Sequence, residues 1–517
     1  MDRTFTAKST IKITAFSLLA FTARLVGMSL MNEYNRAVII RDSCITFGVC
    51  EILMISLFFI LQKERKQNFN EDLSTNQKDT FRIFFAIILA CYTVAFMTYF
   101  PGTSYCDTTF IIRNGMMMGN QFPPVFCLIM VLFTKLGTFL GSIRMGYIIY
   151  TILQVILVSY ISAWICEWAR KKDMPKLIKC ILFLYVALNP LFAVYAVSVI
   201  KDTLFSIAVA AITALLYDLV VERKTSDKAC WEGVAFLTAL IIIFRNNGLY
   251  IMVPLLIILL FVLKDCRKEI LLILGEIVFI QLVAKVLAWR FDFTALFKES
   301  VAIPLQQISA VVAKDGVITQ SQMEFINNIM PLEKIKESYD SSYVDPIKWS
   351  IYFNDGFIND NKFEFIKVWF EILLNNFGIY VKAYLQQTLW FWIPMNHKDV
   401  LLVTWLGGVP QEWLTENGLI ITPLLNGKIL SILTKYYESA KLIPCEGICI
   451  WFMFAMCLLR NLTLKDKKTL IGFLPCILLW LTIMISAPTN AGTRYILPFM
   501  YGVPVFVTMT FAKTYKQ

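Results

Sequence analysis

The chain alternates long apolar runs with short polar connections, and this pattern predicts its architecture. A helix needs about 20 mostly apolar residues to cross the hydrocarbon core of a bilayer. Runs of this kind lie at 10–31, 43–62, 81–100, 145–166, 177–199, 203–221, 231–248, 249–263, 269–289, 445–460, 468–487 and 495–512. We therefore predict an all-α polytopic membrane protein with about 12 transmembrane helices and both termini on one side.

Clusters of basic residues test this count, because Lys and Arg gather in the cytoplasmic loops of membrane proteins. The clusters are Lys63, Arg65 and Lys66; Arg170, Lys171, Lys172 and Lys176; Arg223, Lys224 and Lys228; Lys264, Arg267 and Lys268; and Arg460, Lys465, Lys467 and Lys468. With twelve spans all of them are cytoplasmic, as are both termini, provided that the stretch 125–140 does not cross the cell membrane. That stretch is short and contains Lys135, so we predict a juxtamembrane helix at the outer interface.

Composition agrees with this architecture. The 517 residues are 58% hydrophobic and 16% charged, whereas soluble domains are about one quarter charged. This balance excludes nucleic-acid-binding proteins, secreted disulfide scaffolds and cytosolic enzymes, and the net charge of +11 is attributed to cytoplasmic loops. One histidine, His397, and 13 cysteines without a CxxC pair give no metal-binding pattern. We expect no cofactor, and a divalent metal ion is possible but not expected.

One long polar interval, residues 290–444, is predicted to form an extracytoplasmic, mostly helical domain. It separates a transmembrane core at 1–289 from C-terminal transmembrane helices at 445–517. Its segments 364–394 and 400–433 are amphipathic and rich in Trp and Tyr, which favours helices resting on the lipid headgroups. The alternative is an ordinary domain core.

The outer ends of the apolar runs hold few charges, and these residues are the candidate site. The first outer loop, 101–124, contains a single acid, Asp107, with Arg113 six residues later. A lone carboxylate just outside a membrane helix is a candidate general base. Burial against aromatic neighbours would raise the pKa of this acid toward neutrality, whereas Arg113 would lower it. The alternative is a solvated acid that caps a helix.

Further polar residues lie at the same depth. They are Lys201 and Asp202, at the turn into the run 203–221; Arg245 and Asn246, at the end of 231–248; and Arg494 and Tyr495, in the segment APTNAGTRYILP. Arginines held at the headgroup level are expected to bind a phosphate. The alternatives are a helix N-cap for the acid and simple snorkelling for the arginines.

The order of these motifs is informative. A first outer loop with an aromatic residue, Gly and Asp is followed by Pro123 and Pro124 before a juxtamembrane helix, and Arg144 then opens the next span. This layout, over about 81–290, resembles the GT-C superfamily of integral membrane glycosyltransferases, which includes protein O-mannosyltransferases and aminoarabinose transferases. The motifs FPGTSYCD, KDTLFS, FRNNG, IPLQQIS, VDPIK and GTRYILP are similar to those of a largely uncharacterised bacterial branch of that superfamily.

The resemblance implies an inverting glycosyltransferase whose donor is a sugar on a polyprenyl phosphate and whose acceptor is an extracytoplasmic glycan, lipid or protein. Asp107, in the outer loop 101–144, would be the catalytic base, and Asp202 would orient the acceptor or an arginine. The lipid phosphate would be bound by Arg494, Arg245, Lys201, Arg113 and Tyr495, and the acceptor or sugar would be contacted by Gln306, Gln307 and Asn246. Thr108 and Phe122 stand where relatives carry a second acid and a His, which favours a metal-independent enzyme.

Two other classes stay open. A transporter or flippase of lipid-linked saccharides would also be polytopic, but it would hold charges near the bilayer midplane. In this chain the charges cluster at the outer edge, with Arg24 in the first run as the main exception. A non-catalytic membrane scaffold would explain the spans but not the outer arginines.

Overall fold

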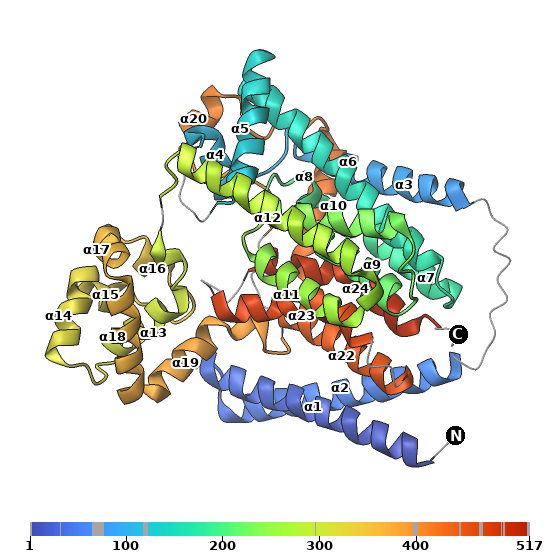
Figure 1. Ribbon diagram of the computed structural model, residues 1–517, viewed down its shortest axis with the longest axis horizontal. Coiled ribbons are helices and arrows are strands. Elements are labelled where there is room, and N and C mark those ends of the chain that lie inside the picture. The colour runs from blue at the N-terminus through green and yellow to red at the C-terminus, as the bar shows by residue number, and fades with distance from the viewer. Residues whose placement is uncertain are drawn as a thin grey trace.

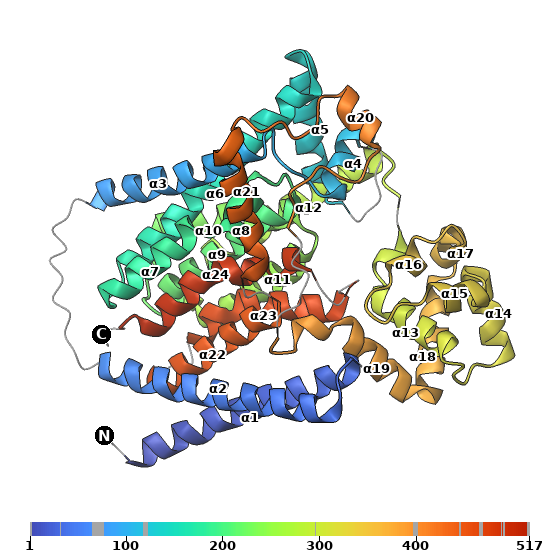
Figure 2. The same cartoon turned by 180° about the vertical axis from the view of Figure 1, so that it is seen from behind.

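The computed structural model shows a helical protein (Figures 1 and 2). The structure describes residues 3–31, 33–64, 77–116, 122–294, 296–395, 402–443, 446–464, 469–486, 489 and 492–513. Helices make up 79% of it, and no strand occurs in the described residues. The predicted all-α class is therefore confirmed.

The helices form three groups. The main bundle consists of α1 (Arg3–Met31), α2 (Arg36–Glu64), α3 (Gln77–Thr98), α6 (Ile143–Arg170), α7 (Lys176–Ala187), α8 (Pro190–Val197), α9 (Lys201–Val220), α10 (Lys228–Phe244), α11 (Asn247–Val262), α12 (Arg267–Arg290), α22 (Gly447–Leu464), α23 (Thr469–Ser486) and α24 (Thr493–Phe511). The helices that pack around the bundle are α4 (Cys106–Asn114), α5 (Pro124–Phe139), α20 (Gln411–Glu416) and α21 (Gly427–Glu438). The separate group beside the bundle contains α13 (Ala302–Ala313), α14 (Gln320–Ile329), α15 (Leu332–Ser338), α16 (Asp345–Lys348), α17 (Asp355–Asp360), α18 (Lys362–Asn375) and α19 (Phe377–Gln387).

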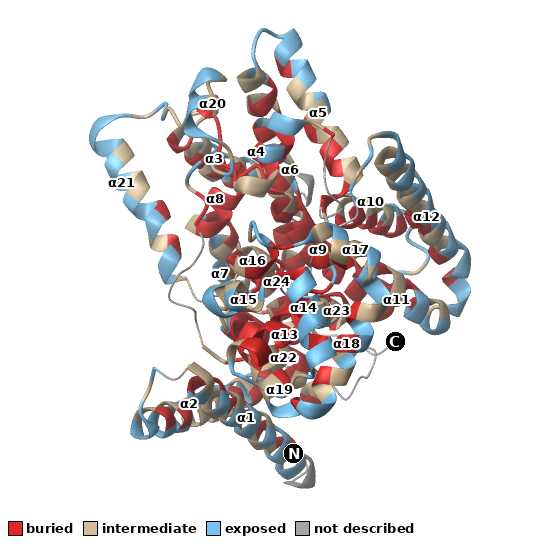
Figure 3. Ribbon diagram, turned by 90° about the vertical axis from the view of Figure 1, so that its left-hand side faces the viewer, coloured by how far each residue is buried: buried red, intermediate tan, exposed pale blue. Residues whose placement is uncertain are grey.

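The bundle has the surface of a membrane protein. Helix α9 is buried along its whole length, whereas α12 exposes large apolar side chains such as Leu272 (66%), Phe279 (67%) and Trp289 (78%) (Figure 3). Among the described residues six helices are long and apolar enough to span a membrane, or eight if two bent helix pairs each count as one span. Large apolar side chains facing outward at this density are compatible with a lipid environment. The predicted count of twelve is not confirmed.

The apolar stretch 125–140 forms α5, which packs against α6. At 16 residues this helix is about 24 Å long, shorter than the roughly 30 Å of a hydrocarbon core. Gly137 and Gly146 allow the two helices to touch, because a Cβ at Gly137 would lie 2.7 Å from the Ser142 carbonyl oxygen. The prediction that this stretch does not cross by itself is not tested by length, because α11, whose run was predicted to cross, is also 16 residues long.

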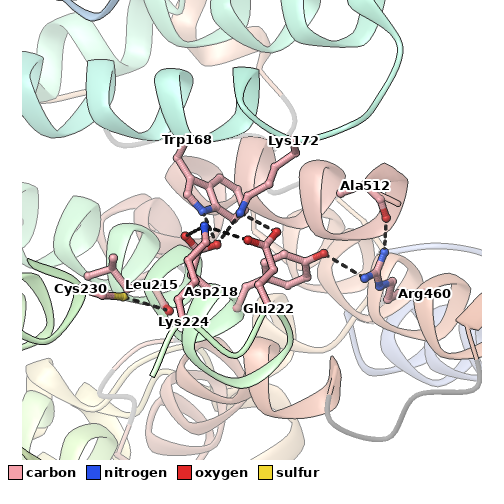
Figure 4. A network of polar contacts seen from close by, with 10 residues as sticks. Trp168, Lys172, Leu215, Asp218, Glu222, Lys224, Cys230, Arg460 and Ala512 are labelled. Carbon is pink, nitrogen blue, oxygen red and sulfur yellow. Dashed lines mark hydrogen bonds and ion pairs between the residues drawn. The ribbon is translucent and has the colours of Figure 1, made fainter. Parts of the chain in front are cut away.

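The chain ends and several basic clusters meet at one end of the bundle. The two termini lie at the same side in Figures 1 and 2, and the backbone N–H of Lys513 donates to the Asp173 carbonyl at 3.1 Å. Figure 4 shows the ion network at this end, which consists of Trp168, Lys172, Asp218, Glu222 and Lys224. The ammonium of Lys172 lies 2.5 Å from Asp218 and 2.7 Å from Glu222. Two of the predicted cytoplasmic clusters are thereby brought together.

The interval 290–444 does not pack as one unit. Side chains of α13 to α19, from Val301 to Tyr380, enclose a core of their own. Side chains between Leu402 and Ala440 instead belong to the large core of the bundle. Trp369, on α18, packs against the separate core, as the domain-core alternative expects, while Trp413 packs against the core of the bundle.

Candidate functional site

A backbone bridge brings the first outer loop to the turn before α9. Thr103 and Ser198 pair in parallel, with Thr103 N donating to Val197 O at 3.1 Å and Val199 N donating to Thr103 O at 2.7 Å. The buried amide of Gln154 donates to the Ser198 carbonyl at 2.7 Å and fixes this turn from α6. Since α4 and α9 begin three residues after the bridge on each side, their first turns lie next to each other.

Asp107 and Lys201 form the first ion pair of the site. The Lys201 ammonium lies 2.8 Å from Asp107 Oδ2, and the two side chains are 12% and 25% exposed. Lys201 also lies over the ring of Phe122, 5.0 Å from its centroid. The acid is therefore close to the surface but is held by a cation that is nearly buried.

Arg494 approaches the same carboxylate oxygen from α24. Its Nη1 lies 3.6 Å from Asp107 Oδ2, and its Nη2 donates to the Tyr495 hydroxyl at 3.2 Å. The guanidinium lies 5.1 Å from the ring centroids of both Tyr105 and Tyr495. Two aromatic rings therefore fix the position of this arginine.

Arg245 and Asp202 form a second pair beside the first. Arg245 Nη1 lies 2.5 Å from Asp202 Oδ1, with the side chains 13% and 2% exposed. The Arg245 guanidinium lies 4.9 Å from the centroid of Tyr495, so this ring lies against both arginines. Asp202 does not cap α9, whose N-cap is Ile200. The capping alternative for Asp202 is therefore wrong, and its carboxylate pairs with Arg245.

Three helices start at this site without a side-chain cap. They are α4, α9 and α24, and their first turns carry Asp107, Lys201 and Arg494. A helix N-terminus presents free N–H groups and a partial positive charge, both of which favour anions. Three such ends beside three cations and two carboxylates create a positive environment, which is suited to a phosphate.

The pKa of Asp107 falls from its usual value of 3.8 to about 2. Burial would raise this pKa, but the charges of Lys201 and Arg494 and the hydrogen bond from Lys201 outweigh that effect. Of the two opposing effects that the sequence suggested, the lowering by nearby cations prevails. The cations responsible are remote in sequence, and Arg113 is not among them.

A strap formed by residues 402–409 covers α4. Ser104 N donates to Trp405 O at 2.9 Å, and the Thr109 hydroxyl donates to the Gly407 carbonyl. Gly408 has a φ of 88° and lies against Cys106, where a Cβ would come within 2.7 Å of the cysteine Cβ. Beyond the Gly-Gly pair nothing in the sequence signals this contact, because about 300 residues separate the two segments.

Several predicted site residues lie elsewhere. Arg113 is exposed in the last turn of α4, and six helical residues place it about 120° around the helix from Asp107. Gln306 is fully buried and donates to Asp340 O, while Gln307 accepts from the Trp369 indole at 2.9 Å. The structure thus brings neither Arg113 nor the two glutamines into the group around Asp107, and it does not support their predicted roles.

Asn246 stays a candidate, because it is exposed and directly follows Arg245. Arg144, which opens α6, lies 5.2 Å from the centroid of Phe100 and bonds to Thr422, so it anchors the outer segments. Among the described residues no group of three or more His, Cys, Asp or Glu side chains could hold a metal ion. His397 and Pro488 lie outside the described residues.

Comparison with known families gives one match. A family of unknown function, DUF6020, matches residues 110–398, which is more than half of the chain. The chain belongs to this family. The DUF6020 region contains Lys201, Asp202 and Arg245, whereas Asp107 and Arg494 lie outside it. No curated protein and no solved structure matches the chain.

Proposed function

We propose that this DUF6020 protein is a GT-C-like membrane glycosyltransferase that moves a sugar from a polyprenyl phosphate to an acceptor outside the cytoplasm. The observation that carries the proposal is the convergence of Asp107 with Lys201 and Arg494 at three uncapped helix N-termini. A phosphate on a lipid chain is an anion that such a group of cations can bind. A carboxylate beside it can accept a proton.

The proposed step transfers the sugar with inversion. The acceptor hydroxyl oxygen attacks the anomeric carbon, the bond from that carbon to the phosphate oxygen breaks, and the lipid phosphate leaves with the bonding electrons. Asp107 accepts the hydroxyl proton. Because the oxygen becomes acidic as it bonds to an oxocarbenium-like carbon, the carboxylate accepts the proton only late in this step.

The cations act on the leaving group. Arg494, Arg245 and Lys201 would stabilise the charge that develops on the phosphate, and each well-placed donor is typically worth about 3 kcal/mol of barrier. The positions of the two arginines between aromatic rings support this role, because a fixed donor needs no reorganisation during the reaction.

The proposal extends to topology. Twelve spans, cytoplasmic termini and a site at the outer face of the cell membrane would follow from the positive-inside rule. The ion network at the C-terminal end of α9 is about 26 Å from Lys201, measured as 17 helical residues, and this length is close to a hydrocarbon thickness. The site would then lie at the leaflet opposite to the basic clusters.

The transporter alternative has less support. Helix α9 carries no charged residue between Asp202 and Asp218, although it is the most buried helix of the bundle. Arg24 donates to the Pro394 carbonyl at 3.1 Å, which ties α1 to the segment after α19. A midplane charge of the kind that a transporter uses is thus absent from α9.

The direct test is to incubate the purified protein with a series of polyprenyl-phosphate sugars and candidate acceptors and to follow release of the polyprenyl phosphate. The Asp107→Asn variant should lose transfer by at least about 100-fold. Arg113→Gln is the matched control, because it removes a charge from α4 outside the site. Full transfer by Asp107→Asn at normal expression would refute the role of this acid.

A further inference from the structure

The three cations of the site are held to different degrees. Arg494 lies near two aromatic rings and donates to the Tyr495 hydroxyl, and Arg245 is paired with a buried acid and lies 5.4 and 4.9 Å from two ring centroids. Lys201 contacts a single ring, that of Phe122, and Asp107. A lysine ammonium is a point charge on a flexible stem, whereas an arginine guanidinium is a planar fork that pairs in a fixed geometry. Lys201 is therefore the cation that can move at the lowest cost.

The two oxygens of Asp107 have different surroundings. Lys201 and Arg494 both pair with Oδ2, at 2.8 and 3.6 Å. No hydrogen bond or ion pair to Oδ1 occurs in the described part of the chain, and the side chain is 25% exposed. Asp107 Oδ1 is therefore open to an incoming hydroxyl. The carboxylate stays a poor proton acceptor as long as two cations pair with Oδ2.

An anion at this site would compete with Asp107 for the same cations. Its phosphate oxygens would be drawn to Arg494, to Lys201 and to the free N–H groups of α9, and a bound negative charge would favour departure of the lysine from the carboxylate. We propose that Lys201 transfers from Asp107 to the donor phosphate when the donor binds, so that Asp107 becomes an effective base only in the donor-bound protein. This inference rests on the proposed function, since it assigns the order of events at the same site.

The charged and titratable groups around Asp107 support this exchange. Those near the carboxylate are Tyr105 before α4, Cys106 in its first turn, Cys127 on α5, Lys201 on α9, Arg245 after α10 and Arg494 on α24. Asp202 and Tyr495 contact the two arginines. In the free protein the pKa of Asp107 is about 2, despite burial that raises it, because of Lys201 and Arg494. Departure of Lys201 and arrival of a phosphate both act to raise this pKa.

The exchange predicts proton uptake on binding. A suitable probe is farnesyl methyl phosphate, a lipid phosphodiester whose single charge does not titrate near neutrality. Calorimetry of the full-length protein in detergent, in two buffers with different ionisation enthalpies, counts the protons taken up between about pH 4 and pH 6. We expect uptake in the wild-type protein and an affinity that rises by up to about tenfold per pH unit as the pH falls.

Two variants test whether Asp107 takes up the protons and whether departure of Lys201 causes the uptake. Asp107→Asn should bind the diester without taking up protons. Lys201→Met should take up fewer protons than the wild type, because its Asp107 has already lost the lysine before the anion arrives. Equal uptake in Lys201→Met and wild type would overturn the transfer, since the anion charge alone would then explain the shift. Arg113→Gln should match the wild type.

The outcomes separate the two proposals. If the diester binds and Arg494→Ala weakens it, but no proton uptake depends on Asp107, the exchange is wrong and the phosphate site stands. If the wild-type protein does not bind the diester, or if Arg494→Ala binds it equally well, the phosphate site itself is wrong, and the exchange falls with it.

Discussion

Replacing Arg245 by Met should destabilise the protein by about 3–5 kcal/mol, because the change leaves the Asp202 carboxylate buried without its partner. That carboxylate is only 2% exposed, and its Oδ1 lies 2.5 Å from the arginine. At this distance and an effective dielectric constant of about 20, the attraction is about 7 kcal/mol before the cost of desolvating both groups. Each of the two ring contacts of Arg245 adds about 1 kcal/mol.

A double-mutant cycle separates the ion pair from the ring contacts. Arg245→Met, Asp202→Asn and the double variant would be unfolded in mixed micelles with increasing dodecyl sulfate, and the free energy of unfolding compared with that of the wild type. The double variant should lose at least about 2 kcal/mol less unfolding free energy than the sum of the two single losses.

The exposed pair Lys228–Glu232 on α10 is the control. Its groups are 3.5 Å apart and 90% and 66% exposed, so a cycle on this pair should give a coupling below about 0.5 kcal/mol. A coupling for Arg245 and Asp202 as small as that of the control pair would refute the view that a buried pair holds the arginine in place.

Four further changes test other parts of the structure. Lys172→Met should cost about 3 kcal/mol of unfolding free energy, because two buried or half-buried acids lose their shared cation, while Lys228→Met should cost less than about 0.5. Gly408→Ala should lower the melting temperature and the transfer rate together, because the strap over α4 has no room for a Cβ at a φ of 88°. Gln307→Leu should destabilise the protein by about 1–3 kcal/mol and leave the KM for the donor unchanged, as expected of a core side chain and not of a sugar contact. The pKa of Asp107 is lowered from 3.8 to about 2, so the ionised acid contributes about 2 kcal/mol of stability above pH 4, and this contribution is lost as the pH falls toward 2. The difference in unfolding free energy between wild type and Asp107→Asn should therefore shrink between pH 4 and pH 2. A difference that stays constant over that range would contradict the lowered pKa.

The position of a residue at the end of an apolar run could be predicted from the sequence, and this position was enough to find the residues that the structure brings together. Asp107, Lys201, Asp202, Arg245 and Arg494 all lie at the ends of apolar runs, where few other charges occur. Since the helices of one bundle end at similar levels, residues at these ends lie in one narrow layer. The structure brings all five within one connected set of ion pairs and ring contacts.

The direction of a side chain around its helix could not be predicted in the same way. Arg113 follows Asp107 in the same short helix, but its position depends on where α4 begins, and a shift of one residue turns a side chain by about 100°. Gln306 and Gln307 lie outside the predicted apolar runs, so the sequence did not place them relative to Asp107. In the structure they are buried beside the core of α13 to α19. The pKa of Asp107 depended on distances between elements that no spacing in the sequence encodes.

The two ends of α9 show why one ion network is structural and the other is a candidate site. At the C-terminal end, Lys172 and Lys224 balance Asp218 and Glu222, so that network is satisfied without a ligand. At the N-terminal end two carboxylates face three cations, and the helix itself adds a partial positive charge that no side chain caps. A surplus of positive charge that is largely buried costs free energy unless an anion offsets it. The surplus positive charge at this end is the physical reason for expecting a phosphate there.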